Sequence, residues 1–488
     1  MIYIEQNSQA YNNDLRVMLL AFYKGERIVD AYSLEKKPEL KMSVSMMLKA
    51  DFKEDGVSLY IYDVVDGKQG APVAMRMVTC DTADRQASRN PIKLALYDML
   101  SKRTGRTLKW GTLTGIRPAK IAMKHIEEGY SDEEIVSIYE RDYKTDVEKA
   151  ELSVRVAHKE QELLTGLDCE HGYCLYVGIP FCPSRCLYCS FTSYPIDRYS
   201  ARVDEYIDAL EKELTFVADR YKDKELLSIY MGGGTPSSIS EGQIDRICGI
   251  IADRFDLSHL REYTIEAGRP DSITAAKLEA MKAHGVDRIS INPQTMNEKT
   301  LELIGRKHTP EDVVHVMGMA RELGFENINM DIIVGLPGED LAMTEHTMEA
   351  IREMAPDSLT VHSLAIKRAA DLNINMDMYK DRMNECDIDD QLSLVSRTAD
   401  LMGLAPYYLY RQKNIAGNLE NVGYATPGKE CLYNILIMEE KTDIIGVGAG
   451  SSCKLIRGTR IDRLENVKNV DEYIDRIDEM LDRKKALG

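Results

Sequence analysis

The clearest pattern along the chain is an alternation of short apolar runs with amphipathic segments of helical length between residues 174 and 361. The apolar runs predict six strands, at 175–179, 227–231, 263–267, 288–292, 327–334 and 358–361. Helical periodicity fills the gaps, at 203–221, 241–254, 275–284, 310–323 and 341–354. Because strands that alternate with helices pair in parallel, we predict an α/β fold, either a partial (β/α)6 TIM-like barrel or an open doubly wound sheet.

The first part of the chain has a different pattern. Arg16–Phe22 and Val57–Asp63 are alternating runs with turn-forming glycines between them, which is typical of a small antiparallel sheet. Ile92–Arg103 and Ser131–Leu164 have helical spacing instead. We therefore expect an α+β N-terminal domain of unknown role at 1–165, a barrel core at 166–375, and a smaller C-terminal domain at 376–488 that covers the substrate site.

One loop candidate in the first part carries basic residues, in the run Leu113-Thr-Gly-Ile-Arg-Pro-Ala-Lys120. Arg117 and Lys120 could bind an anion there. A solvated turn followed by a helix start explains the same residues equally well. Both interpretations stay open from the sequence.

Composition narrows the class of protein without naming a function. Of 488 residues, 44% are hydrophobic and 29% charged, which is typical of a globular chain and excludes collagen-like and disordered classes. The net charge of −18 disfavours bulk nucleic-acid binding, because such a chain repels phosphate. Since no leader-like segment and no long apolar window occur, we expect a cytoplasmic protein that does not bind membranes.

The ten cysteines are distributed unevenly. Cys182, Cys186 and Cys189 form a C-x3-C-x2-C run directly after the first predicted strand. Three thiolates from one short loop can bind three irons of a [4Fe–4S] cube and leave the fourth iron open to a non-protein ligand. Structural zinc, which usually takes four protein ligands, and a chance grouping of buried thiols are the alternatives.

Unusual polar and glycine residues fall at the ends of the predicted strands: Tyr176, Gly232–Gly234, Glu266, Gln294 and Asp331. Parallel strands of a barrel bring their carboxyl ends to one rim, so we expect these residues to meet at one site. Three glycines would let the backbone approach a small ligand. Glu266 could accept ribose hydroxyls or form a structural salt bridge. Asp331, in an apolar strand, needs a partner or a ligand.

These motifs resemble those of a known family. Tyr176-Val-Gly-Ile-Pro-Phe-Cys182-x3-Cys186-x-Tyr188-Cys189, Gly-Gly-Gly-Thr-Pro236, Ser290-Ile-Asn-Pro-Gln294 and Asp331-Ile-Ile-Val-Gly-Leu-Pro337 are similar to motifs of the radical S-adenosylmethionine (SAM) superfamily. Within it, the chain resembles the oxygen-independent coproporphyrinogen III oxidases. Leu113-Thr-Gly-Ile-Arg-Pro118 and Tyr408-Leu-Tyr-Arg-Gln-Lys-Asn414 point to the HemZ-type coproporphyrinogen dehydrogenase branch.

The resemblance implies a cofactor set and a residue set. Cys182, Cys186 and Cys189 would hold a [4Fe–4S] cluster and, with Tyr176, make up the expected catalytic residues. S-Adenosyl-L-methionine would bind the open iron. Its expected contacts are Tyr176, Tyr188, Gly233, Gly234, Thr235, Glu266, Gln294, Arg306, Asp331 and Ala365.

The resemblance also implies a reaction and partners. A 5′-deoxyadenosyl radical would abstract hydrogen from propionates of coproporphyrinogen III, and loss of CO2 and an electron would leave the vinyl groups of protoporphyrinogen IX. A tetracarboxylate substrate needs cations, for which Arg306, Lys307, Lys367, Arg368, Arg411 and Lys413 are available. The electron would come from a donor such as flavodoxin or ferredoxin, and the N-terminal domain would cover the barrel or dock a redox partner.

Two other functions stay open. Many coproporphyrinogen oxidases carry a further cysteine two residues after the third cluster ligand, whereas this chain has Phe191 there. That cysteine is also missing in the related haem-chaperone branch, which binds haem without making it. The chain lacks that branch's His-Asn-x-x-Tyr-Trp sequence, and its only tryptophan is Trp110. A radical SAM enzyme that acts on another tetrapyrrole is the third possibility.

Overall fold

The computed structural model describes residues 1–488 except 24, 116, 368, 376–377, 380–381, 383–387, 412–418, 459 and 487–488. By its internal contacts the chain forms two compact units. Unit 1 comprises Met1–His158 and Arg411–Glu420, and unit 2 comprises Lys159–Tyr410 and Asn421–Gly488. The three-domain division with breaks at 165 and 375 stays a prediction.

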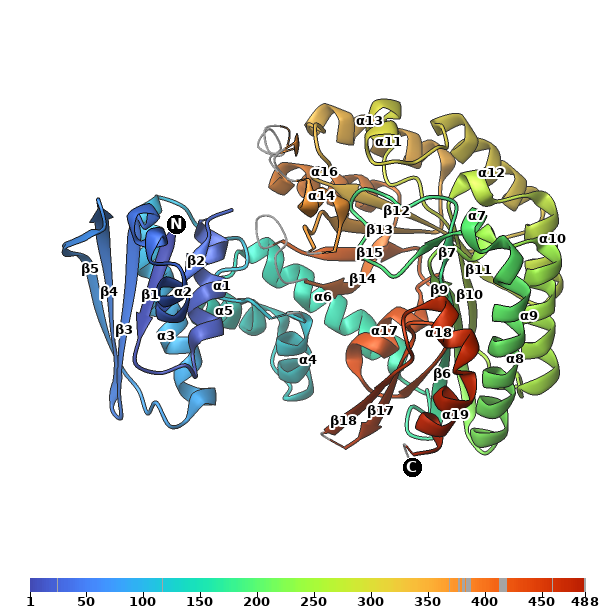
Figure 1. The fold of residues 1–488 in the computed structure, drawn as a ribbon, viewed down its shortest axis with the longest axis horizontal. Helices are drawn as coiled ribbons and strands as arrows, with labels where there is room; N and C mark the ends of the chain where they lie inside the picture. The colour runs from blue at the N-terminus through green and yellow to red at the C-terminus, as the bar shows by residue number, and fades with distance from the viewer. Residues whose placement is uncertain are drawn as a thin grey trace. The chain divides into compact units, whose positions relative to one another are not determined.

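Unit 2 is built on an eleven-stranded sheet in the order β14-β15-β13-β12-β11-β10-β9-β6-β16-β17-β18 (Figure 1). Its six central strands run parallel: β6 (Gly172–Ile179), β9 (Glu225–Gly233), β10 (Glu262–Gly268), β11 (Arg288–Ile291), β12 (Ile328–Val334) and β13 (Ser358–Ser363). Each overlaps one of the six strands predicted from the apolar runs. The α/β partial-barrel prediction is confirmed.

Five long helices connect these strands and lie on the outer side of the curved sheet (Figure 1). They are α8 (Val203–Arg220), α9 (Glu241–Arg254), α10 (Ala275–Ala283), α12 (Pro310–Glu322) and α13 (Leu341–Met354), close to the predicted ranges. Ser240 and Thr309 start α9 and α12 with capping boxes, which satisfy backbone N–H groups of the first turn. The connections also contain α7 (Ile196–Tyr199) and α11 (Glu298–Leu303), and β13 is followed by α14 (Asp371–Ile374) and α16 (Ile388–Leu401).

Strands from the last part of the chain extend both edges of the barrel sheet. β15 (Asn421–Ala425) pairs antiparallel with β13, and β14 (Ala405–Tyr410) pairs with β15. At the other edge β16 (Asp443–Val447) pairs parallel with β6, followed by antiparallel β17 (Ser452–Arg457) and β18 (Arg460–Glu465). The helices of this part are α17 (Leu432–Glu439), α18 (Val470–Asp475) and α19 (Ile477–Lys485).

Unit 1 is an α+β unit with a five-stranded sheet in the order β2-β1-β3-β4-β5. The strands are β1 (Ile2–Gln6), β2 (Ile28–Val29), β3 (Met46–Lys53), β4 (Gly56–Val65) and β5 (Lys68–Thr79). The sheet is mixed and not purely antiparallel as expected, because β1 pairs in parallel with β2 and β3. The helices are α1 (Asn12–Phe22), α2 (Ala31–Lys36), α3 (Arg85–Thr104), α4 (Ala119–Glu127) and α5 (Asp132–Tyr143). Helix α6 (Val147–Leu164) begins in unit 1 and continues into unit 2 from Lys159.

The prediction of a strand at Arg16–Phe22 is wrong, because this segment lies within helix α1. The buried side chains Leu15, Met18, Leu19 and Phe22 recur every three or four residues, so they form one helical stripe in the core of unit 1. In a short apolar run, the sequence pattern does not distinguish a strand from a helix. Packing against the rest of the core decides which of the two forms.

Arg411 and Glu420, at the two ends of the segment that joins β14 to β15, are anchored in unit 1. The Glu420 carboxylate accepts a hydrogen bond from the Trp110 indole N–H at 2.6 Å and pairs with Lys149. The Arg411 guanidinium stands 5.1 Å from the centre of the Trp110 ring and donates to the carbonyl of Leu113 at 2.5 Å. The buried ends of this segment are therefore fixed by charge-assisted contacts.

We expect Glu420→Ala to destabilise the protein by about 3–5 kcal/mol, because it leaves the Lys149 ammonium and the Trp110 N–H buried without their carboxylate. Denaturant unfolding measures this change. The matched control is Glu5→Ala, which removes an exposed partner of Lys49 and should cost less than about 1 kcal/mol. Equal losses in the two variants would contradict the role given to Glu420.

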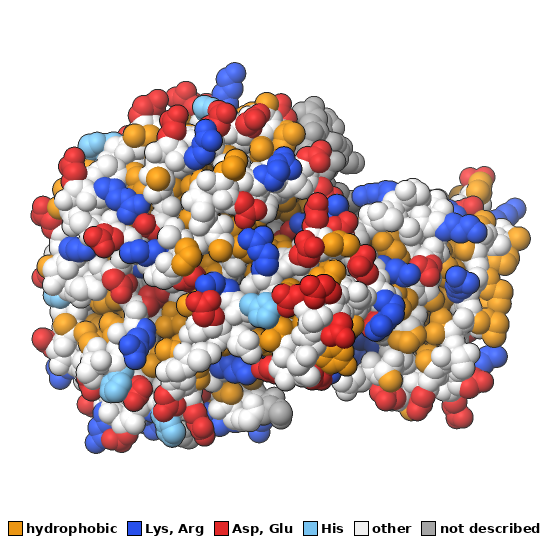
Figure 2. All heavy atoms as spheres, turned by 180° about the vertical axis from the view of Figure 1, so that it is seen from behind, with side chains coloured by type: hydrophobic (Ala, Val, Ile, Leu, Met, Phe, Trp, Pro, Cys, Tyr) orange, Lys and Arg blue, Asp and Glu red, His pale blue; other side chains and the backbone are white. Residues whose placement is uncertain are grey.

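Charged side chains of both signs are interspersed over the face of unit 2 seen in Figure 2. Within the described residues, no helix has both the length and the apolar character needed to cross a membrane.

Candidate functional site

The carboxyl ends of the six parallel strands carry the residues selected from the sequence, all of them in unit 2. Tyr176 lies on β6, Gly233 ends β9, Glu266 lies on β10 and Asp331 on β12. Gln294 follows β11, and Ala365 is half-buried two residues beyond β13. Parallel pairing from β6 to β13 places these positions along one rim.

The cysteine run forms a loop closed by a small two-stranded sheet, in which β7 (Phe181–Cys182) pairs with β8 (Tyr194–Pro195). The Leu187 N–H donates to the Ile304 carbonyl at 3.0 Å, and the Leu372 N–H donates to the Leu187 carbonyl at 2.9 Å. Neighbouring segments therefore hold the loop on two sides. Cys186 is buried, whereas Cys182 and Cys189 are half-buried.

The three thiols lie close enough to influence one another's pKa values. Burial raises the pKa of the Cys182 thiol, the Thr235 hydroxyl 3.4 Å away lowers it, and Cys189 and Cys186 raise it further. Burial also raises the pKa of Cys189, against a lowering by the Phe191 backbone N–H. Thiols with raised pKa values stay protonated until a metal takes the proton's place, so assembly of a cluster here would release protons.

The loop fits an iron–sulfur cube better than it would fit one ion. Among the residues that the structure describes, no three His, Cys, Asp or Glu side chains are grouped closely enough to hold a single metal ion. A cube takes one thiolate per iron, so its ligands need not converge on one point. Three thiols on one short loop provide that donor set.

Arg306 is a half-buried cation beside the cysteine loop. Its Nη1 donates to the Asn292 carbonyl at 2.6 Å and its Nη2 to the Tyr188 hydroxyl at 3.2 Å. Although burial lowers the pKa of this guanidinium, Tyr188 and Cys186 raise it. The Nε atom has no hydrogen-bond partner. A half-buried cation whose Nε donor is unused is suited to bind an anionic group of a ligand.

The glycine turn after β9 packs closely against the strand and the loop beside it. Gly233 has φ +109°, a conformation that side-chain-bearing residues rarely adopt, and a Cβ there would lie 3.3 Å from the Tyr176 hydroxyl. A Cβ on Gly234 would lie 2.5 Å from the Phe181 carbonyl oxygen. Backbone hydrogen bonds from Gly234 and Thr235 to Ile179 and Phe181, 2.7 Å each, fix this turn against the start of the cysteine loop.

Three tyrosines form a stack inside the barrel next to Glu266. The ring of Tyr230 lies 6.3 Å from that of Tyr176 and 4.5 Å from that of Tyr433, with small interplanar angles. The Tyr230 hydroxyl donates to the Glu266 carboxylate. Burial raises the pKa of Glu266 to about 7, while the Tyr230 hydrogen bond lowers it. A carboxylate with this environment is ready to accept hydroxyl donors from a ligand.

We expect Glu266→Gln to stabilise the ligand-free protein at pH 8 but not at pH 4. The folded pKa of about 7 lies above the ordinary value of 4.5, so the contribution of Glu266 to stability is lost as pH rises through this window. At pH 8 the variant should gain on the order of 2 kcal/mol. Urea unfolding at the two pH values measures the difference, with Glu241→Gln on the exposed start of α9 as the control. An identical gain at both pH values would contradict this assignment.

Asp331 is held in place by hydrogen bonds between the neighbouring strands β12 and β13. The side-chain amide N–H of Asn329 donates to Asp331 at 2.7 Å. The side-chain amide oxygen of Asn329 accepts from the hydroxyls of Ser358 and Thr360 at 3.1 and 3.0 Å. His362 Nε2 lies 3.8 Å from the second oxygen of Asp331. Although burial opposes ionisation, His362 and Asn329 lower the pKa of Asp331. The carboxylate is therefore charged and oriented before any ligand binds.

Gln294 takes a left-handed conformation, with φ +68°. Its N–H donates to the Asp331 carbonyl at 2.9 Å, and its carbonyl accepts from the Ile333 N–H at 3.0 Å. The residue thus bridges β11 to the middle of β12. Strain of this kind at a rim is common where a side chain must be aimed at a ligand.

Four residues of this region escaped the sequence analysis: Tyr230, Asn329, His362 and Tyr433. The first three follow the period of two along their strands, so that Tyr230 shares a face with Gly232, Asn329 with Asp331, and His362 with Thr360. That period could have identified them. Tyr433 comes from α17, and no local pattern connects it with the barrel.

The proposed substrate cations are only partly placed. Arg306 is at the rim, Lys307 is exposed beside it, and the Lys367 ammonium lies over the Phe191 ring. Arg411 belongs to unit 1, where Trp110 and Leu113 engage it. Arg368 and Lys413 lie outside the described residues.

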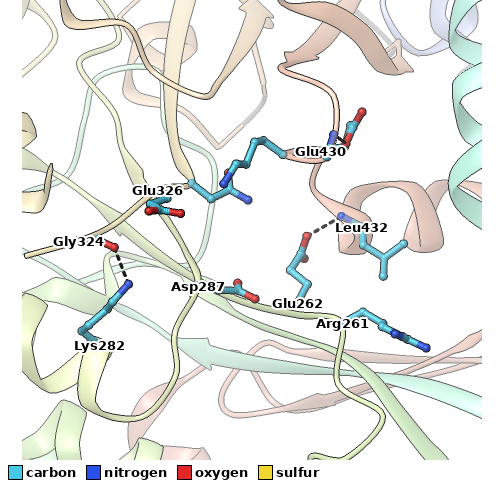
Figure 3. A pocket seen from close by; sticks show the side chains of 11 residues that line it. Arg261, Glu262, Lys282, Asp287, Gly324, Glu326, Glu430 and Leu432 are labelled. Atoms are coloured by element: carbon cyan, nitrogen blue, oxygen red, sulfur yellow. Dashed lines mark hydrogen bonds between the residues drawn. The ribbon is translucent and has the colours of Figure 1, made fainter.

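A polar cavity of about 510 Å³ lies at the opposite, amino-terminal ends of the strands (Figure 3). Glu262, Asp287 and Asn327 line it where β10, β11 and β12 begin. Glu262 accepts hydrogen bonds from the N–H groups of Leu432 and Tyr433 at 2.6 and 3.2 Å, which fixes the start of α17 (Figure 3). Because catalytic residues of such barrels lie at the carboxyl ends of the strands, we do not assign the candidate site to this cavity. Its residue Glu262 fixes the helix that carries Tyr433 of the tyrosine stack.

Comparisons with known proteins show the family to which the chain belongs. The family described as "Radical SAM superfamily" matches residues 176–351. The chain is 40% identical over 402 residues to "Oxygen-independent coproporphyrinogen-III oxidase-like protein HemZ" of Bacillus subtilis (strain 168), covering 81% of this chain and 80% of that protein. It is 34% identical over 306 residues to "Heme chaperone HemW" of the same strain, covering 62% and 76%. The solved coproporphyrinogen III oxidase HemN of Escherichia coli aligns with a TM-score of 0.49 and 23% identity over 67% of this chain and 73% of that one.

Proposed function

Since the chain belongs to the radical SAM superfamily and, within it, to the oxygen-independent coproporphyrinogen III oxidase group of HemZ type, we propose that it converts coproporphyrinogen III to protoporphyrinogen IX. Members of this superfamily use a [4Fe–4S] cluster and S-adenosylmethionine. The observation that carries the proposal is the meeting of the cysteine loop, the glycine turn, Glu266 and Asp331 at one rim, in a chain so similar to an oxidase-like relative.

The cofactors would bind to defined residues of this chain. Cys182, Cys186 and Cys189 would hold the cluster. When bound, the cluster would supply the electron for reductive cleavage of S-adenosylmethionine, the source of the radical chemistry proposed here. The Glu266 carboxyl group would accept the ribose hydroxyls, and Arg306 would bind an anionic group through its unused Nε donor.

The chain's own contribution is binding, orientation and the exclusion of water. Tyr176, Tyr230 and Tyr433 form an aromatic wall beside Glu266 inside the barrel. Such a wall would keep water away from the reacting carbon. A primary carbon radical requires this exclusion because it must react only with its target. Asp331, oriented by Asn329 and His362, offers a second fixed acceptor across the rim. Rigid groups on neighbouring strands hold both ends of a ligand in one geometry.

The relation to HemW supports a second candidate, a haem-binding chaperone without oxidase activity. The only tryptophan, Trp110, is buried in unit 1, where it donates to Glu420, so it is not an exposed haem contact. A radical SAM enzyme for another tetrapyrrole is the third candidate.

Anaerobic incubation of the reconstituted protein with S-adenosylmethionine, a chemical reductant and coproporphyrinogen III tests the proposal. We expect the monovinyl and divinyl products by chromatography, together with methionine. Stoichiometric haem binding with no change in coproporphyrinogen would support the chaperone. Cleavage of S-adenosylmethionine that responds only to another tetrapyrrole would support the third candidate.

A further inference from the structure

The outer face of the cysteine loop exposes an aromatic ring next to a cluster ligand. Phe191 is two residues after Cys189 and its side chain is 67% exposed, although large apolar side chains are usually buried. The Phe191 backbone N–H interacts with the Cys189 sulfur. One residue thus connects the third thiol of the run with the protein surface.

Cations lie on the cysteine loop and on two segments that contact it. The Lys367 ammonium lies 5.7 Å from the centre of the Phe191 ring. Arg185, inside the cysteine run, donates from Nη2 to the Ala369 carbonyl at 2.6 Å. Lys307 is exposed two residues after Gly305, whose carbonyl accepts from the Ser184 hydroxyl at 3.1 Å. We call Arg185, Phe191, Lys307 and Lys367 the cluster-loop face.

The charge of this face is opposite to that of the chain as a whole. The chain carries a net charge of −18, whereas the four residues of the face contribute three cations. The acidic side chain nearest to Arg185 is Asp371, at 4.0 Å and half exposed to solvent. Most of the surface of this acidic chain repels an acidic partner protein, whereas a local basic surface attracts it. The partner is therefore steered to the basic surface when the two proteins meet.

The chemistry of the proposed function requires an electron from outside. Resting on that function, we propose that the cluster-loop face docks a small acidic one-electron carrier protein, with Phe191 at the centre of the contact and Arg185, Lys307 and Lys367 around it. An exposed aromatic residue with a basic rim is the arrangement that protein interfaces favour for their central contact. One electron leaves the reduced carrier and passes to the cluster through the short path at Cys189.

The test uses the reconstituted full chain and a reduced acidic flavodoxin as the probe. Calorimetric titration should give binding that weakens as salt rises from low to physiological concentration. Lys367→Glu should weaken flavodoxin binding about tenfold or more, because it places a like charge in the contact. Arg254→Glu, an exposed charge reversal at the end of α9, is the matched control and should leave the affinity unchanged.

A second variant separates docking from chemistry. Phe191→Ser should reduce flavodoxin affinity and flavodoxin-driven methionine release, while methionine release driven by dithionite stays within about twofold of the wild type. Flavodoxin that binds Lys367→Glu and Phe191→Ser as tightly as the wild type, or that does not bind the wild type, would overturn the proposal. So would a loss of coproporphyrinogen affinity in Lys367→Glu with flavodoxin binding intact, because the face would then serve the substrate. Absence of dithionite-driven cleavage in the wild type would refute the proposed function instead, whatever the flavodoxin affinity.

Discussion

Cys186→Ala is expected to abolish both the brown iron–sulfur absorbance and the release of methionine from S-adenosylmethionine. Cys186 is the buried member of the C-x3-C-x2-C loop, and Leu187 next to it is hydrogen-bonded to Ile304 and Leu372 on either side. The loop therefore cannot bring another thiol into its place. A cube held by two protein thiolates loses one iron site and is not retained.

The matched control is Cys174→Ala, which removes a fully buried thiol from β6, the strand that leads into the same loop. Cys174 packs in the apolar cluster with Tyr407 and Ile444, so its loss should cost only the small free energy of a shortened core side chain. Iron content and methionine release should stay at the wild-type level. Iron retained in Cys186→Ala, or lost equally in both variants, would contradict the assignment of the ligands.

Gly234→Ala should reduce the affinity for S-adenosylmethionine by at least about a hundredfold and lower the stability of the protein. The added Cβ would lie 2.5 Å from the Phe181 carbonyl oxygen and 2.9 Å from the Ile179 carbonyl oxygen, both of them backbone atoms. Since neither can rotate away, the turn after β9 must move, and ligand contacts that depend on its position are lost. Equilibrium binding of S-adenosylmethionine to the reconstituted protein measures the effect.

Gly242→Ala is the control for that substitution. Gly242 lies in the first turn of α9 and a Cβ there meets nothing within 4 Å. Alanine has the higher helix propensity, so this variant should be more stable by about 0.5–1 kcal/mol and should bind S-adenosylmethionine normally. Similar losses in the two variants would mean that the glycine turn has no special part in binding.

The sequence predicts the barrel well because its strands are buried on both faces and its helices are amphipathic. Runs such as 227–231 and helices such as 241–254 therefore appear almost at their observed bounds. The rim residues follow from the same pattern, since topology alone brings the carboxyl ends of parallel strands together. The positions of Glu266 and Asp331 at the ends of predicted parallel strands identify them from the sequence alone.

What the sequence could not predict depends on packing between distant segments. The stripe of Leu15, Met18, Leu19 and Phe22 is too short to distinguish helix from strand. The position of Tyr433 beside Tyr230 follows from Glu262, more than 160 residues earlier, which fixes the start of α17. Arg411 was a candidate for the substrate site, but its partners Trp110 and Leu113 lie almost 300 positions away in unit 1. No local period encodes such contacts.

The central claim is that a radical made at this site takes hydrogen from the propionate side chains of coproporphyrinogen III. The most direct measurement is mass spectrometry of the 5′-deoxyadenosine formed when the reduced, reconstituted protein acts on coproporphyrinogen III deuterated along those side chains. We predict 5′-deoxyadenosine that carries deuterium, formed together with the vinyl products. Unlabelled 5′-deoxyadenosine beside unchanged coproporphyrinogen would contradict the claim.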